Sequence, residues 1–504
     1  MKRAFSLSRQ ALHQTIFYTV LFSLLAHGYR FLNMSFSGDA AQISQSEEVL
    51  YQISIGRFLQ PVLWMVRGHI TAPLTIGLFA TAALTGSAIL IVSLLGLTSH
   101  LSILFVCGIL ATNETLSVSY ATYLPWVDVY MIALFFSVAG VYVSMRYVHG
   151  WLLSPLFYLV TLGLYQSYLQ AASTLIILLL ILFLLQGENT QKIWSLGIRA
   201  CLSLFAGLLL YAASLRIVLS LFSLSASNDY NGVSRVGTMA FSEIPHLLKT
   251  TYLYPIQFFA RDADHAFVHP LLTIALLLLS LTVLLFSFRL LTRGGKLTLL
   301  FLLFLLPLGS NFVAFISQGI VHPLMVFSFF FLYVLCISLL DHIQNRPFFC
   351  KLRPMTSLVS VILCCILCTN ILTANQLYLR RDLEFYSTTS AATRILKHAD
   401  QIEGYIPGKT PVFMLGYLPS SKISLVRPGF ESLSNLQGMR YTYAAAYETA
   451  TPWYYQMILG YPVNFVHIDD YYRLRTSGIA DNIPSFPNEH CYQMIDGILF
   501  IRIN

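Results

Sequence analysis

The sequence predicts a polytopic α-helical membrane protein of about eleven transmembrane helices with a small C-terminal α/β domain. Of the 504 residues, 56% are hydrophobic and only 10% are charged, against about 25% charged in soluble domains. The apolar residues form blocks, such as 271–288 and 355–372, close to the roughly 20 residues that cross a bilayer as a helix. These blocks do not alternate apolar and polar residues, so helices are favoured over the strands of a barrel.

The expected transmembrane helices follow the apolar blocks, with boundaries uncertain by several residues. They are 11–31, 72–96, 100–112, 126–145, 151–167, 169–186, 195–222, 269–290, 297–317, 323–341 and 355–373. The first block resembles a signal sequence, but His27, Tyr29 and Arg30 follow it where small residues would mark a cleavage site. We therefore expect a retained first helix.

Basic residues orient these helices, because cytoplasmic loops are rich in Lys and Arg. With a cytoplasmic N-terminus, the inner segments carry Lys2, Arg3, Arg9, Arg146, Lys192, Arg199, Arg289, Arg293, Lys296, Arg346, Lys351 and Arg353. The same segments contain two acids, whereas the outward segments before residue 374 contain nine. Eleven helices then place residues 374–504 outside the cytoplasm.

Three outward segments are large, namely 32–71, 223–268 and the C-terminal region, while the inner loops are short. We therefore predict a transmembrane domain over 1–373 and an extracytoplasmic α/β domain over 374–504. The C-terminal region holds 11 of the 22 acids and three strand-like runs, 411–416, 464–468 and 497–503.

The distribution of charge argues against a nucleic-acid-binding protein, and the distribution of cysteines argues against a disulfide-bonded C-terminal domain. The net charge of +8 reflects the residues that orient the helices, and no basic helix with interleaved aromatic residues indicates nucleic-acid binding. Seven of the eight cysteines lie in or beside apolar blocks, and only Cys491 lies in the C-terminal region. A single cysteine excludes a disulfide scaffold there.

The first outward loop combines acids and arginines at the mouth of the helices: Asp39, Glu47, Glu48, Arg57 and Arg67. Transfer of a sugar to a hydroxyl needs a carboxylate base and cations that stabilise the charge on a leaving phosphate. Arginine suits the second task because its planar fork binds two phosphate oxygens. The competing interpretation is that the arginines snorkel to the interface and that the acids are solvated.

Several stretches carry a resemblance to a known family. They are Phe36-Ser37-Gly38-Asp39, Ile55-Gly56-Arg57-Phe58-Leu59, Arg67-Gly68, Tyr123-Leu124-Pro125-Trp126-Val127-Asp128, 162–168 (LGLYQSY), 483–491 and 495–501. Together they resemble the bacterial glucosyltransferase II family, which includes phage-encoded, serotype-converting O-antigen glucosyltransferases. The likeness is strongest before residue 170.

The resemblance implies a GT-C-type fold in the bacterial inner membrane and a donor of undecaprenyl-phosphate-glucose. The acceptor would be the O-antigen of lipopolysaccharide or another surface polysaccharide. By position, Asp39 would deprotonate the acceptor hydroxyl, which displaces the polyprenyl phosphate with inversion. No acidic pair stands at 39–40 and one stands at Glu47-Glu48, so which acid acts stays open. No cofactor is predicted, although a divalent metal is not excluded.

Further candidate site residues are chosen because they lie at or near the outer membrane face. Candidates for binding the donor phosphate are Arg57, Arg67, Arg216 and Arg235. Arg216 lies in an apolar helix, where an ionisable group is often functional but can also snorkel outward. Candidates for binding the acceptor are Tyr165, Gln166, Trp126 and Asp128, and the alternative for these is an interfacial aromatic belt.

Expected partners are the lipid bilayer, the lipid-linked donor, the polysaccharide acceptor, and flippase and donor-synthesising proteins. The main alternative function is a polysaccharide or lipid-linked sugar transporter (flippase). It predicts polar residues along the middle of several helices, which are mostly bare here. A polymerase or ligase, and a structural membrane protein, are further alternatives. The transporter also leaves the terminal domain unexplained. A polymerase or ligase typically has a large loop rather than a terminal α/β domain, and a structural protein leaves the acid–arginine loop without a purpose.

Overall fold

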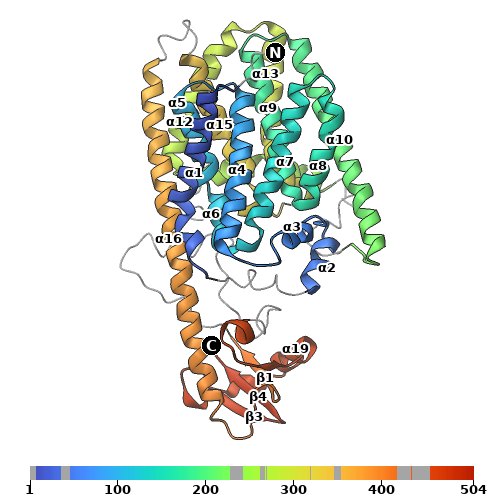
Figure 1. Ribbon diagram of the computed structural model, residues 1–504, viewed down its shortest axis with the longest axis vertical. Coiled ribbons are helices and arrows are strands. Elements are labelled where there is room, and N and C mark those ends of the chain that lie inside the picture. Colours follow the sequence, from blue (N-terminus) through green and yellow to red (C-terminus); the bar gives the residue numbers. More distant parts are fainter. Residues whose placement is uncertain are drawn as a thin grey trace. The chain divides into compact units, whose positions relative to one another are not determined.

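The computed structural model describes residues 7–35, 46–226, 242–260, 267, 269–317, 319–344, 353–416, 433 and 454–503 (Figure 1). The chain divides into two compact units. Unit 1 comprises Met1–Leu32, Val49–Tyr120 and Leu124–Asn375. Unit 2 comprises Asn33–Glu48, Ala121–Tyr123 and Gln376–Asn504.

Unit 1 is a bundle of helices. They are α1 (Arg9–Leu32), α3 (Gln60–Val66), α4 (Pro73–Leu95), α5 (His100–Thr112), α7 (Val127–Arg146), α8 (Gly150–Leu164), α9 (Leu169–Leu185), α10 (Thr190–Leu221), α11 (Ile244–Ala260), α12 (Pro270–Leu290), α13 (Arg293–Ser310), α14 (Phe312–Ile316) and α15 (Phe331–Gln344). Short 3₁₀ turns precede α7, α9 and α15 at Leu124–Trp126, Gln166–Tyr168 and Phe327–Phe330. Three helices contain residues of both units: α2 (Ser46–Ser54), α6 (Glu114–Thr122) and α16 (Arg353–Ala399).

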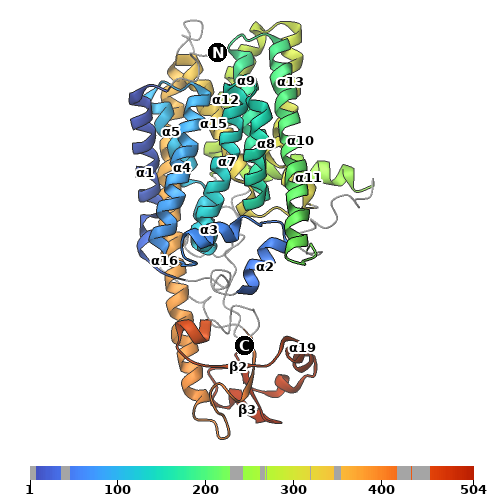
Figure 2. The same cartoon turned by 45° about the vertical axis from the view of Figure 1, so that its right-hand side comes forward.

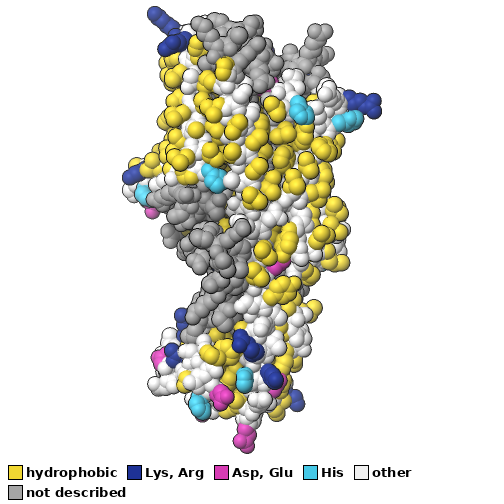
Figure 3. Space-filling model, turned by 90° about the vertical axis from the view of Figure 1, so that its left-hand side faces the viewer, with side chains coloured by type: hydrophobic (Ala, Val, Ile, Leu, Met, Phe, Trp, Pro, Cys, Tyr) yellow, Lys and Arg dark blue, Asp and Glu magenta, His cyan; other side chains and the backbone are white. Residues whose placement is uncertain are grey.

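Eight helices within the described ranges are long and apolar enough to cross a membrane. Hydrophobic side chains cover most of the bundle surface seen in Figure 3. These features agree with the predicted class of helical membrane protein, whereas the count of eleven transmembrane helices stays a prediction. Inside the bundle, α7 packs against α4 and α8, α10 against α8, and α1 against α4 and α5.

Helix ends in the bundle follow local sequence. Pro73 opens α4, where its missing N–H costs nothing. Gly96 closes the same helix with a positive φ of 63°, the left-handed conformation that favours glycine.

Asn113 explains a difference from the sequence prediction. The helix expected at 100–112 is followed at once by α6, which reaches Thr122. The Asn113 side chain donates to Ile109 O (3.2 Å) and Leu110 O (2.8 Å) and accepts from Leu116 N (3.0 Å). One buried amide therefore caps the end of α5 and the start of α6.

α16 also departs from the prediction, because it does not end near residue 373 but continues to Ala399. No glycine or proline occurs from 355 to 399, so nothing in the backbone terminates the helix where the apolar block ends.

Unit 2 contains a four-stranded sheet in the order β2 (Asn464–Phe465), β1 (Pro411–Leu415), β4 (Ile498–Arg502) and β3 (Tyr492–Ile495). β1 runs parallel to β2 and β4, and β3 runs antiparallel to β4. Alternate residues of β1 and β4 face opposite sides. Val412 and Leu499 pack with the end of α16, while Phe413 and Phe500 pack with α19 (Ile468–Thr476).

Candidate functional site

The segment 55–60 of the first loop is hydrogen-bonded to the junction between α8 and α9. Leu59 N donates to Gly163 O at 2.9 Å. Gln60 Nε2 donates to Leu164 O at 2.7 Å. In the other direction, Gln166 Nε2 donates to Ile55 O at 3.0 Å. Residues about 105 positions apart are thus joined at one end of the bundle, where Figure 1 shows α3 beside the ends of α7 and α8.

Gly56 makes the turn in this segment, with a φ of 85°. The Tyr211 hydroxyl, from α10, donates to Gly56 O at 3.1 Å and accepts from Gln166 Nε2 at 3.0 Å. A Cβ at position 56 would collide with that hydroxyl and would stand 2.9 Å from Gln166 Nε2. Both the conformation and the space therefore require glycine.

Arg57 follows this turn and is buried, with 6% of its surface exposed. Its guanidinium carbon lies 4.8 Å from the centre of the Tyr165 ring, a cation–π contact. Nη1 also donates to Gln52 Oε1 at 3.4 Å. Tyr165 in turn packs on Tyr130 and Tyr168, with ring centres 4.5 and 5.6 Å away. The loop thus holds a cation against an aromatic cluster at the end of the helices.

Arg67 and Asp128 form a buried ion pair. Nη1 of Arg67 lies 2.9 Å from both carboxylate oxygens of Asp128, and Nη2 donates to Pro125 O at 2.6 Å. Burial lowers the pKa of Arg67, and the Asp128 charge opposes that shift. The pair joins the residue after α3 to the start of α7, next to the buried Trp126. The phosphate role for Arg67 and the acceptor roles for Trp126 and Asp128 stay predictions.

Of the predicted catalytic acids, only Glu48 has a side chain that the structure describes. Asp39 is not among the described residues, and neither is Arg235. The backbone of Glu47 belongs to α2, but its side chain is outside the description. Glu48 is buried in the same helix. Which acid is the base therefore stays a prediction.

The phosphate role predicted for Arg216 stays a prediction. This residue is exposed on α10, five residues after Tyr211, which corresponds to about 140° around the helix. Of the four predicted phosphate ligands, Arg57 and Arg67 are therefore the two that lie in the described part of the first loop.

Two further arginines were missed by the sequence reasoning. In unit 2, Arg380 Nε and Arg381 Nη1 pair with the two oxygens of Glu384 at 2.8 and 3.1 Å. Arg381 Nη2 donates to Thr122 Oγ1 at 2.9 Å. All three charged side chains are mostly buried. The signal in the sequence is their spacing of three and four residues, which places them on one helix face, but α16 was expected to end before them.

Among the residues that the structure describes, no group of three or more His, Cys, Asp or Glu side chains could hold a metal ion.

The long apolar helices and the buried cations of the first loop define a helical membrane protein with a polar site at one end of its bundle. A family model described as Glucosyl transferase GtrII matches residues 28–339, more than half of the chain. The chain belongs to this family, which confirms the resemblance seen in the sequence. Membership implies a glucosyltransferase that acts on surface polysaccharide. No curated protein and no solved structure matches the chain.

The matched range contains the first loop, the α8–α9 junction and Tyr211, which together fix segment 55–60. Residues 340–504 lie beyond it. The likeness that we noted at 483–501 therefore has no counterpart in the family match.

Proposed function

We propose that this glucosyltransferase uses undecaprenyl-phosphate-glucose as donor and transfers the glucose to a surface polysaccharide, such as O-antigen, on the outer face of the bacterial inner membrane. One observation carries the proposal. Segment 55–60, inside the family match, is bound to the α8–α9 junction and holds the buried Arg57 against Tyr165. A fixed cation at the end of membrane helices suits a phosphate at headgroup level.

In the proposed reaction, the Asp39 carboxylate takes the proton of the acceptor hydroxyl. The hydroxyl oxygen bonds to the anomeric carbon while the bond from that carbon to the phosphate oxygen breaks. Undecaprenyl phosphate leaves with the electron pair, and the configuration inverts. Arg57 stabilises the charge on the leaving phosphate. Glu47 and Glu48 are the alternative bases.

The acceptor enters beside Tyr165 and Gln166 in this proposal. Two features support that place. Tyr165 belongs to a buried cluster of three tyrosines and contacts Arg57, so an acceptor beside it lies next to the cation. Gln166 holds the loop carbonyl of Ile55, so its amide sets the position of the segment that carries Arg57.

The outer location is supported by the distribution of charge. Arg146 ends α7, and the turn that follows begins α8. Tyr165 follows the other end of α8, which is 15 residues long, or about 22 Å at 1.5 Å per residue. A cytoplasmic Arg146 would leave the loop site at the opposite, outer end of α8, which supports the proposed location.

The test is sugar transfer in membranes from radiolabelled undecaprenyl-phosphate-glucose to acceptor polysaccharide. We compare the unmodified protein, Asp39→Asn and Glu188→Gln at equal expression. Glu188 is a matched control because its carboxylate pairs with Lys192 (2.6 Å) in a different loop. The expected result is loss of transfer in Asp39→Asn alone.

Two other results have clear meanings. Transfer that persists in Asp39→Asn keeps the donor and moves the base to Glu47 or Glu48, which the corresponding glutamine variants then separate. The absence of transfer from the unmodified protein, with undecaprenyl phosphates of several hexoses tried, overturns the proposed donor.

A further inference from the structure

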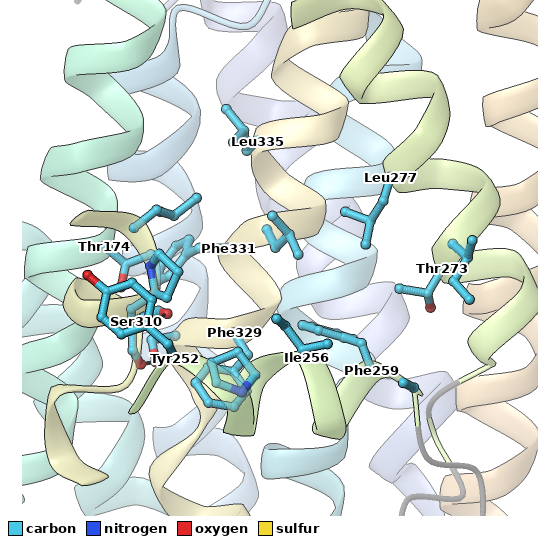
Figure 4. Close-up of a pocket in the computed structure, with 17 residues that line it drawn as sticks. Thr174, Tyr252, Ile256, Phe259, Thr273, Leu277, Ser310, Phe329, Phe331 and Leu335 are labelled. Atoms are coloured by element: carbon cyan, nitrogen blue, oxygen red, sulfur yellow. Dashed lines mark hydrogen bonds between the residues drawn. The ribbon is translucent and has the colours of Figure 1, made fainter. Parts of the chain in front are cut away.

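An apolar cavity of about 340 Å³ lies between α11, α12, α13 and α15. Figure 4 shows Tyr252, Ile256 and Phe259 of α11 around it, together with Thr273 and Leu277 of α12. Phe329, Phe331 and Leu335 complete much of its inner wall. Among the described residues, none that lines the cavity is charged.

The hydroxyl groups in the wall already have partners. Thr174 donates to Gln170 O (2.6 Å), Tyr252 to Phe304 O (3.0 Å), Ser310 to Pro307 O (3.1 Å) and Ser328 to Ser310 O (2.6 Å), and Thr273 bonds the Tyr333 hydroxyl (2.8 Å). A ligand with hydrogen-bonding groups would therefore lose its own bonds to water on entering. The cavity suits a hydrocarbon chain.

Cross-links between elements hold the cavity open. Pro255 has no N–H, so Thr251 O lacks its helical donor, and Asn311 Nδ2 donates to that carbonyl at 3.1 Å. Tyr252 binds α13 through Phe304 O. These bonds fix α11, which runs crosswise to the long helices in Figure 2, against α13 and α14.

The mouth of the cavity faces the outside of the bundle. Ile256 and Ile274 line it and are 64% and 46% exposed, whereas Thr273 on its inner side is 1% exposed. Ile274 belongs to α12, which is long and apolar enough to cross a membrane. A chain could therefore enter sideways from the lipid.

A cation lies on the same face of α11 as the mouth. Lys249, Tyr252 and Ile256 are spaced three and seven residues apart, which places them on one side of the helix. Lys249 is exposed, and within the described ranges no carboxylate forms a salt bridge with it. Seven residues correspond to about 10 Å along the helix. An anionic headgroup and an apolar chain side by side are what this arrangement accommodates.

We propose that this cavity holds the chain of the polyprenyl phosphate donor next to its head as the donor enters from the lipid, and that Lys249 faces the phosphate before it reaches Arg57. The inference rests on the proposed donor. A water molecule takes about 30 Å³ in the liquid and a methylene group is of similar size, so a cavity of 340 Å³ takes on the order of ten carbon atoms, or about two isoprene units. The rest of the chain stays in the bilayer.

The test uses the full chain in nanodiscs and undecaprenyl phosphate that carries a diazirine in one of its first two isoprene units. After illumination, labelled peptides are mapped by mass spectrometry. We expect labels within 252–260 and 270–277, displaced by excess undecaprenyl phosphate but not by the same excess of phosphatidylglycerol. Equal displacement by phosphatidylglycerol, or the absence of labels from both of these ranges, overturns the proposal.

Matched variants test the site itself. Leu277→Trp fills the cavity, whereas Leu278→Trp adds the same bulk at a neighbouring side chain that is 59% exposed and does not line it. We expect about tenfold less labelling in Leu277→Trp and no loss of labelling in Leu278→Trp. Both variants should elute from a sizing column at the same volume as the unmodified protein. Lys249→Gln should reduce labelling several-fold and Lys249→Arg should preserve it. Equal labelling of Leu277→Trp and Leu278→Trp contradicts the site.

The binding readout separates this proposal from the proposed function. Labels in the cavity without sugar transfer from any polyprenyl donor leave the lipid site standing and remove the donor assignment. Sugar transfer from the undecaprenyl donor without labels in the cavity leaves the donor assignment standing and removes the lipid site.

Discussion

At the residue scale, Gly56 is where backbone conformation and packing act together. We expect Gly56→Ala to displace segment 55–60 and to reduce sugar transfer at least tenfold. An alanine at a φ of 85° carries about 1–2 kcal/mol of strain, and its Cβ also meets the Tyr211 hydroxyl. Gly404→Ala is the control, because Gly404 has the same φ with no atom within 4 Å of its Cβ. The measurement is transfer and thermal stability; equal losses in both variants would contradict a special role for the contact.

The Arg67–Asp128 pair gives a second residue-scale prediction. Removing one partner leaves a buried charge, at a cost of about 3–5 kcal/mol. We expect Arg67→Met and Asp128→Leu each to lower the unfolding temperature in detergent strongly, and the double variant to lose less than the sum. If Arg67 also binds the donor phosphate, the double variant recovers stability but does not recover sugar transfer.

Residue identity was more predictable than residue contact. The acidic and basic side chains of the first loop were recognisable from their chemistry, but Arg67 and Asp128 are 61 positions apart. Their mutual contact depends on the packing of α3 against the start of α7. Arg57 was likewise expected to face phosphate, whereas its contact with Tyr165 depends on the bonds between segment 55–60 and the α8–α9 junction. No local pattern encodes either contact.

At the element scale, apolarity and helix length have different causes. Hydropathy located the helices because burial in lipid requires apolar blocks. It did not give their ends. α6 extends beyond Asn113 because that side chain caps both helices, and α16 continues for 26 residues past the predicted end at 373 because no breaker occurs. Strand β3 was also missed, although Asp496 and Gly497, both with positive φ, form the two-residue turn that joins it to β4.

The short turn at Pro323–Met325 gives an element-scale prediction about pH. His322 Nδ1 accepts from Leu324 N at 3.3 Å at the start of this turn. Burial lowers the pKa of His322 to about 4 from 6.5. The unfolded chain therefore binds more protons between these values, and stability falls as pH drops from 6.5 towards 4. From pH 7.5 to 5 the loss is about 2 kcal/mol.

Unfolding in detergent at pH 7.5 and pH 5 measures this loss. The matched variant is His322→Asn, because asparagine also accepts a backbone hydrogen bond at such a position and does not titrate. We expect the variant to lose about 2 kcal/mol less than the unmodified protein over the same range. An identical pH dependence in both proteins would show that His322 stays neutral or is solvated in the fold.

At the scale of the whole molecule, the division into two units combines segments that the sequence kept apart. Unit 2 includes Asn33–Glu48 and Ala121–Tyr123 as well as Gln376–Asn504. The strand-like runs at 411–416, 464–468 and 497–503 contain β1, β2 and β4, since β-branched and aromatic residues between turns are a local signal. The inclusion of a first-loop segment is a long-range property, and only the folded chain reveals it. The predicted domain boundary at 373 stays a prediction.

The orientation of the molecule is the last prediction. Inner segments rich in Lys and Arg predict that α19 of unit 2 lies outside the cytoplasm and the α9–α10 turn inside it. We expect Asp469→Cys to react with a membrane-impermeant maleimide in intact spheroplasts, and Glu188→Cys to react only after the membrane is permeabilised. Both positions are accessible, with side chains 89% and 34% exposed. The unmodified protein is the blank and measures the reaction of its own cysteines: Cys491 of unit 2 is buried, whereas Cys201 of α10 and Cys364, Cys365 and Cys368 of α16 are exposed. The reverse pattern would place the first loop, and with it the proposed site, on the cytoplasmic side, where a surface polysaccharide is not available as acceptor.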